Sequence, residues 1–160
     1  MSTLQALETA GKLIRISVRL YRGEQENRLF FALPAFAEWL KQTLPGLEPL
    51  DETDALPAEQ FRILLRDYLI GRRLNVSVDY RRLQPGEKDV FELKTADLRL
   101  FGWFYRRDIF IASFGDSVER VKTHALYNGY RDETVRLRAA LPLDEPKWLK
   151  NAKEDDVISF

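Results

Sequence analysis

Hydrophobic and polar positions alternate along several stretches of the chain, and this period of two predicts β-strands. The alternation runs through residues 12–21 and again through residues 75–83, each time with one apolar side. Short apolar runs predict three further strands over residues 90–94, 97–105 and 109–114. Residues 97–105 place aromatic and aliphatic side chains on both faces, which predicts a central strand covered from both sides.

Apolar residues at helical spacing predict helices over residues 34–44, 57–70 and 132–141. Pro34 and Pro57 suit the first turn of a helix because a missing backbone N–H costs nothing there. The order of elements predicts an α+β fold, a mostly antiparallel sheet with helices packed on one side. We expect one domain over residues 1–141, followed by a charged C-terminal tail over residues 142–160. Trp148 in that tail is expected to anchor a partner or to fold back on the sheet.

The composition of the 160 residues narrows the chemistry that the chain can support. There is no cysteine, which excludes a disulfide, a thiolate nucleophile and a thiolate metal site. The single histidine, His124, makes a histidine-rich metal site unexpected, so we predict no metal and no other cofactor. No apolar run approaches the roughly 18 residues that a membrane span requires, and the first residues lack the pattern of a signal peptide. A cytoplasmic protein without a membrane partner is therefore predicted.

The charges are balanced overall but are unevenly distributed. The chain carries 25 basic and 25 acidic residues. Acidic residues dominate positions 31–61, whereas basic residues dominate positions 62–88. The basic stretch could face a polyanion, or it could be an ordinary solvated surface with acidic neighbours.

The chain contains no phosphate-binding glycine loop, no zinc-protease motif and no nucleophile elbow. Glu92 and Asp97 are interpreted as surface carboxylates beside a strand connection. One chemistry that needs neither metal nor paired carboxylates is RNA cleavage by the 2′-hydroxyl of the RNA itself. It requires groups that move protons and cations that stabilise the phosphorane. Groups of both kinds gather late in the chain: Arg99, Arg120, Lys122, His124, Tyr127 and Tyr130.

Three stretches in this region share an order with a known family. They read ELKTADLRLFGWF, with Arg99 in an aromatic-rich strand, then IFIASFG, then ERVKTHALYNGY. In this order they resemble the RelE/HigB-like, phage-derived branch of the RelE/ParE toxin superfamily, over roughly residues 57–141. The resemblance implies a RelE-like fold and a metal-independent endoribonuclease of a toxin–antitoxin module. It further implies a cognate antitoxin as partner and mRNA and the ribosome as targets, without direct binding of DNA.

The resemblance also implies roles for individual residues. The residues that it places in catalysis are Arg99, Lys122, His124 and Tyr127. Those expected to bind RNA are Lys94, Arg120, Arg81 and Arg82. Arg99 and Lys122 would hold the scissile phosphate, and His124 or Tyr127 would transfer protons. Each role has a structural alternative, such as an ion pair between Arg99 and Asp97.

Three other functions stay open at this point. Relatives of the ParE type share the fold but poison gyrase, so the fold alone does not assign the reaction. A non-catalytic phage or prophage domain that binds another protein would fit the neutral net charge. A stand-alone interaction domain could use the basic region between Arg72 and Arg82 to bind an acidic partner.

Overall fold

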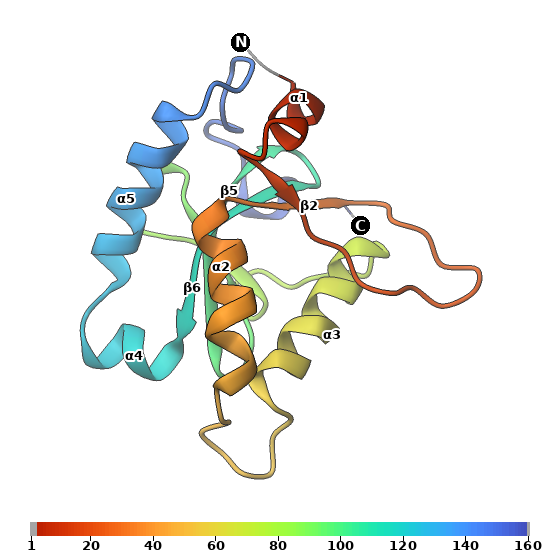
Figure 1. Ribbon diagram of the computed structural model, residues 1–160. Helices are drawn as coiled ribbons and strands as arrows, with labels where there is room; N and C mark the ends of the chain where they lie inside the picture. The colour runs from red at the N-terminus through yellow and green to blue at the C-terminus, as the bar shows by residue number, and fades with distance from the viewer. Residues whose placement is uncertain (1–2, 160) are drawn as a thin grey trace.

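The computed structural model describes residues 3–159, which form five α-helices and a six-stranded sheet (Figure 1). In chain order the elements are α1 Leu4–Thr9, β1 Ile14–Arg15, β2 Leu29–Ala32, α2 Pro34–Gln42, α3 Pro57–Leu69, β3 Tyr80–Arg82, β4 Phe91–Lys94, β5 Leu98–Arg106, β6 Ile109–Ser117, α4 Val118–Thr123 and α5 Tyr127–Ala140. No helix within these residues has the length and apolar character needed to cross a membrane.

The sheet is mixed, with the strand order β1-β2-β6-β5-β4-β3. Strands β2 and β6 run parallel, and the other four neighbouring pairs are antiparallel. The two longest strands, β5 and β6, lie at the centre, and β5 is buried along nearly all of its length. The α+β class and the central, doubly covered strand β5 are therefore confirmed.

Helices cover both faces of the sheet, so the prediction that they gather on one side is wrong. On one face α2 and α3 pack Phe36, Phe61 and Tyr68 against Phe30 and Phe110 of the sheet. On the other face lie α1, α4 and α5, which contact the alternate side chains of the same strands. Figure 1 shows α5 across the sheet from α3. The physical reason is that β5 and β6 are apolar on both faces, and each apolar face must be covered.

A β-bulge in β6 sets which side chains reach α5. Phe101 pairs with Phe114, but the next residue of β5, Gly102, pairs with Ala112, so Ser113 is the extra residue. The Ser113 hydroxyl donates to the carbonyl of Phe101 and lies 2.6 Å from the Thr134 hydroxyl of α5. Because of the bulge, the side chains of Phe114 and Asp116 point toward α4 and α5.

Residues 142–159 belong to the packed domain, so the predicted boundary at residue 141 does not describe this fold. Leu143 and Val157 have no exposed surface, and the amide of Asp108 donates to the carbonyl of Val157. Trp148 folds back on the domain, where the Arg138 guanidinium lies 3.9 Å from its ring centroid. The segment covers apolar surface that would otherwise face water, and its end lies beside the start of β2, where the Arg28 guanidinium donates to the carbonyl of Ser159.

Two N-terminal segments differ from the sequence-based expectation. The four residues of β2 are apolar on both faces and lack alternation, so the period-two pattern did not reveal them as a strand. The predicted strand over residues 12–21 pairs only at Ile14 and Arg15. Beyond Ile16 the chain leaves the sheet as a projecting arm, residues 17–27, and returns at Arg28 (Figure 1).

Candidate functional site

Cross-strand register builds two rows of side chains on the sheet face that α4 and α5 cover. The first row runs across β4, β5 and β6 and contains Lys94, Arg99 and Asp116. The second row runs across β3, β4, β5 and β6 and contains Arg81, Glu92, Phe101 and Phe114. Residues two apart along a strand point the same way, so the rows share one face. We call these seven residues, with Arg120, Tyr127 and Tyr130 from the helices above them, the polar face.

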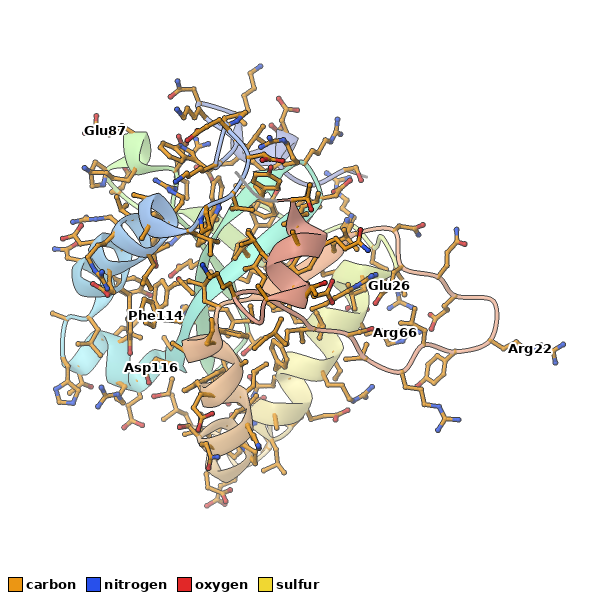
Figure 2. All side chains as sticks on the ribbon, turned by 45° about the horizontal axis from the view of Figure 1, so that its top comes forward. Arg22, Glu26, Arg66, Glu87, Phe114 and Asp116 are labelled. Carbon is orange, nitrogen blue, oxygen red and sulfur yellow. The ribbon has the colours of Figure 1, made fainter. Side chains whose placement is uncertain are left out.

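Asp116 is the point at which the sheet and the two helices meet (Figure 2). Its Oδ2 accepts from the Tyr130 hydroxyl at 2.6 Å and from Arg120 Nε at 3.1 Å, and its Oδ1 accepts from the amide of Ser117. Burial, and then the hydrogen bond to Asp116, raise the pKa of Tyr130 to about 12. Tyr130 therefore stays protonated near neutral pH and acts as a hydrogen-bond donor. The same carboxylate raises the pKa of Arg120, whose side chain remains mostly exposed.

Glu92 is a fully buried carboxylate that the sequence analysis interpreted as a surface group. Its side chain is 0% exposed, and Oε1 accepts from Arg81 Nε at 2.6 Å, while Oε2 has no hydrogen-bond partner. The hydrogen bond to Glu92 raises the pKa of Arg81. A sequence signal was present, because Glu92 lies between Phe91 and Leu93 in an apolar run. A charged residue inside such a run needs a partner in the fold.

Tyr127 closes the polar face beside this ion pair. Its ring packs edge-on against Phe101 with centroids 5.9 Å apart, and the Arg81 guanidinium lies 5.7 Å from its centroid. A small cavity of about 180 Å³ opens between Arg81, Tyr127 and Asn128. The Tyr127 ring thus packs against Phe101 while its side chain and that of Arg81 line the cavity.

Arg99 and Lys94 both project from the sheet onto the polar face, but they differ in burial and in hydrogen-bond partners. Arg99 is 9% exposed, and its Nη1 donates to the carbonyls of Thr95 and Leu98, each at 2.8 Å. These bonds hold the guanidinium in the row that ends at Asp116. The ion pair between Arg99 and Asp97, the structural alternative to phosphate binding, does not form, because Asp97 accepts from Gln60 and from the amide of Leu50. Lys94 donates to the carbonyl of Ser77 at the sheet edge.

The remaining residues of the predicted site divide into two groups. Lys122 lies in the last turn of α4 and His124 is its C-cap, so both are exposed on the same helix that carries Arg120. Arg82 lies apart from the polar face, because its guanidinium packs over the Phe91 ring at 4.9 Å and pairs with Asp89. The fold thus brings together Arg81, Lys94, Arg99, Arg120 and Tyr127, leaves Lys122 and His124 on the adjoining surface, and directs Arg82 elsewhere.

No group of three or more histidine, aspartate or glutamate side chains within residues 3–159 is arranged to hold a metal ion. The comparisons with known proteins found no family model, no curated protein and no solved structure that matches this chain. The arrangement of the polar face is consequently the basis on which a function can be argued. The polar face carries cations from four elements, together with the hydrogen bonds that Asp116 accepts. A tyrosine hydroxyl and the imidazole of His124 lie at its border.

Proposed function

We propose that this protein is a metal-independent endoribonuclease of a toxin–antitoxin module, and that the polar face binds the RNA. The observation that carries the proposal is the convergence of Arg81, Lys94 and Arg99 with Arg120 and Tyr127 from the helices. These five residues are separated by up to 46 positions in sequence. Arginine and lysine side chains on one face suit a phosphodiester, because their charged N–H groups form strong hydrogen bonds with phosphate oxygens.

The proposed reaction is an attack of the RNA 2′-oxygen on the adjacent phosphorus. The 2′-hydroxyl proton passes to a base, the bond from phosphorus to the 5′-oxygen breaks, and an acid protonates that oxygen. The products are a 2′,3′-cyclic phosphate and a 5′-hydroxyl. In this scheme Arg120, Lys122 and Arg99 stabilise the negative charge that develops on the phosphoryl oxygens. His124 and Tyr127 are the proton-transfer candidates, since Tyr130 keeps its proton bound toward Asp116.

The test is inducible expression in a bacterial host, with growth and mRNA integrity followed together. We expect rapid arrest with mRNA cleavage for the wild type and loss of both for the Arg99→Ala/Lys122→Ala variant. Because Arg99 is largely buried, that variant could unfold. Lys122→Ala alone, at an exposed position, should reduce cleavage at least about tenfold without loss of soluble protein.

The matched control is Arg136→Ala, which removes one exposed cation of α5 whose partner within residues 3–159 is Glu133 of the same helix. It should arrest growth like the wild type. Purified protein should also cleave RNA in the presence of a chelator and leave 2′,3′-cyclic phosphate ends. Normal growth with intact mRNA at high soluble expression of the wild type would contradict the proposal.

A second candidate is a non-catalytic domain on this fold that binds another protein. The observation in its favour is that two cations of the polar face are already paired, Arg81 with Glu92 and Arg120 with Asp116. Pairing lowers the net positive charge that an RNA would meet. Under this candidate the purified wild type leaves RNA intact, and its expression leaves growth unchanged.

A further inference from the structure

A second feature suited to nucleic acid lies on the opposite side of the molecule from the polar face, at the end of the projecting arm. The arm comprises residues 17–27, and Figure 2 shows Arg22 at its tip, far from the body of the domain. Its two limbs are joined where Glu26 accepts from the Ser17 hydroxyl at 2.5 Å and pairs with Arg15. The returning limb is anchored to α3, because the amide of Asn27 donates to the carbonyl of Leu69.

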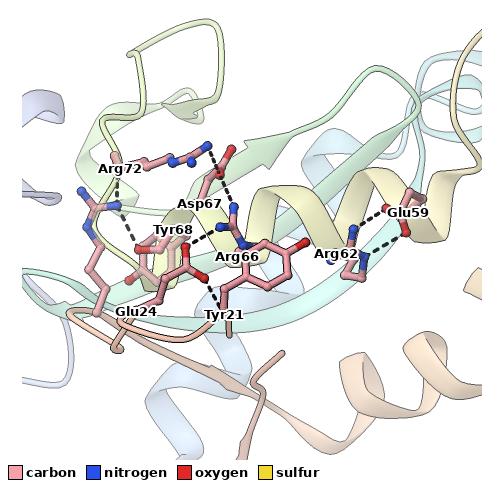
Figure 3. A network of polar contacts seen from close by, with 9 residues as sticks. Tyr21, Glu24, Glu59, Arg62, Arg66, Asp67, Tyr68 and Arg72 are labelled. Carbon is pink, nitrogen blue, oxygen red and sulfur yellow. Dashed lines mark hydrogen bonds and ion pairs between the residues drawn. The ribbon is translucent and has the colours of Figure 1, made fainter. Parts of the chain in front are cut away.

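The tip of the arm contacts α3 through Arg66 (Figure 3). Tyr21 and Glu24 close a turn, in which the amide of Glu24 donates to the carbonyl of Tyr21 and the Glu24 carboxylate accepts from the amide of Tyr21. Gly23 adopts a φ of +86°, which a side chain would disfavour. Arg66 of α3 pairs with Glu24 and places its guanidinium 4.6 Å from the Tyr21 ring centroid.

This arrangement leaves an aromatic ring exposed between two unpaired cations. Tyr21 is 64% exposed although Arg66 covers one side of its ring, so the other side faces solvent. Arg19 and Arg22 flank it in sequence, and neither forms a hydrogen bond or an ion pair within residues 3–159. The tip therefore presents one face of an aromatic ring and two guanidinium groups to the same solvent region.

We propose that the arm tip binds single-stranded RNA, with a base stacked on the open side of the Tyr21 ring and phosphates bound by Arg19 and Arg22. Single-stranded RNA fits because its bases are free to stack, and each adjacent phosphate suits a guanidinium. The guanidinium of Arg66 behind the ring orients it before the ligand arrives. An acidic protein would use the arginines but would leave the ring without a stacking partner. The inference rests on the proposed function in taking RNA as the ligand, but different residues carry it.

The experiment measures binding of a fluorescent, 2′-O-methylated RNA strand of about 12 nucleotides by anisotropy over a range of salt concentrations. The methylated strand lacks the 2′-hydroxyl nucleophile, so binding is measured without cleavage. Tyr21→Ala should weaken binding about tenfold, whereas Tyr21→Phe should bind like the wild type because it keeps the ring. Arg22→Ala should lower the slope of log affinity against log salt by about 0.7, as for one lost phosphate contact on a single strand.

Two controls separate this inference from the ribonuclease proposal. Arg136→Ala removes the same charge elsewhere and should leave the slope unchanged, and Lys122→Ala should keep the contribution of the arm to binding. Equal affinities for the wild type, Tyr21→Ala and Arg22→Ala would overturn the arm inference even if the protein cleaves RNA. Binding of the arm to polyglutamate in preference to the RNA strand would also overturn it, in favour of an acidic protein partner. Loss of cleavage in Lys122→Ala, together with a further loss of binding of about tenfold when Tyr21→Ala is added to Lys122→Ala, would support both.

Discussion

Replacing Arg81 should destabilise the protein more than replacing the residue with which it pairs. Glu92 has no exposed side-chain surface, whereas the Arg81 side chain is 45% exposed. The Arg81→Met variant keeps an apolar stem beside Tyr127 but leaves a buried carboxylate without its cation. Stranding a charge in this way costs about 3 kcal/mol, the lower end of the usual range, because the partner side of the pair is open to water.

Replacing Glu92 instead of Arg81 leaves no buried charge without a partner. In Glu92→Gln the amide oxygen can still accept from Arg81 Nε, and the arginine can turn to solvent, so we expect a cost of about 1 kcal/mol. The double variant should cost about 2 kcal/mol, which is about 2 kcal/mol less than the sum of the single costs. This difference of about 2 kcal/mol is the free-energy cost of burying the Glu92 carboxylate without its arginine.

Urea unfolding followed by tryptophan fluorescence measures these free energies, provided that all four proteins share one m-value. Equal costs for the two single variants would show that water reaches Glu92 in the folded protein. Strict additivity in the double variant would show that the pair does not act as a unit. Either result would refute the assignment of Glu92 as a charge that depends on Arg81.

Two further predictions concern the sheet and the helix above it. Gly102→Ala should lower the free energy of unfolding by at least about 3 kcal/mol or prevent folding, because the added Cβ would overlap the Ile111 carbonyl of the neighbouring strand. Soluble yield and circular dichroism would measure this loss. Tyr130→Phe should make stability less dependent on alkaline pH. The folded pKa of Tyr130, about 12, lies above the ordinary value of 10.0, so folding favours the protonated hydroxyl. The wild type should therefore lose about 1 kcal/mol more stability than the variant as pH rises from 10 to about 12, and no more than the variant below pH 10. Parallel urea midpoints for the two proteins across that range would contradict the second prediction.

Local patterns were sufficient for elements whose burial has a clear period. The helix at Pro57–Leu69 follows the prediction to within one or two residues because its apolar side chains repeat at 3.6 residues, and strand β5 does so because a short apolar run rich in aromatic residues marks it. Arg99, Arg120 and Tyr127 of the polar face were named from the sequence because they belong to the basic and aromatic stretches near the end of the chain, whereas Asp116, which joins Arg120 to Tyr130, was not. Their joint use as a site stays a prediction.

The sequence by itself determined the α+β class and the composition of the basic and aromatic stretches. Tertiary structure alone decided that Glu92 is buried against Arg81, that helices cover both faces, and that residues 142–159 close the core. It also decided that Arg28 is buried, donating to the carbonyls of Tyr68, Arg72 and Ser159. The physical reason is that the local sequence does not identify the partner of a buried charge, even where, as at Glu92, an apolar run indicates the burial. Partners up to 131 residues away satisfy its polar atoms, and only the folded chain brings them within hydrogen-bond distance.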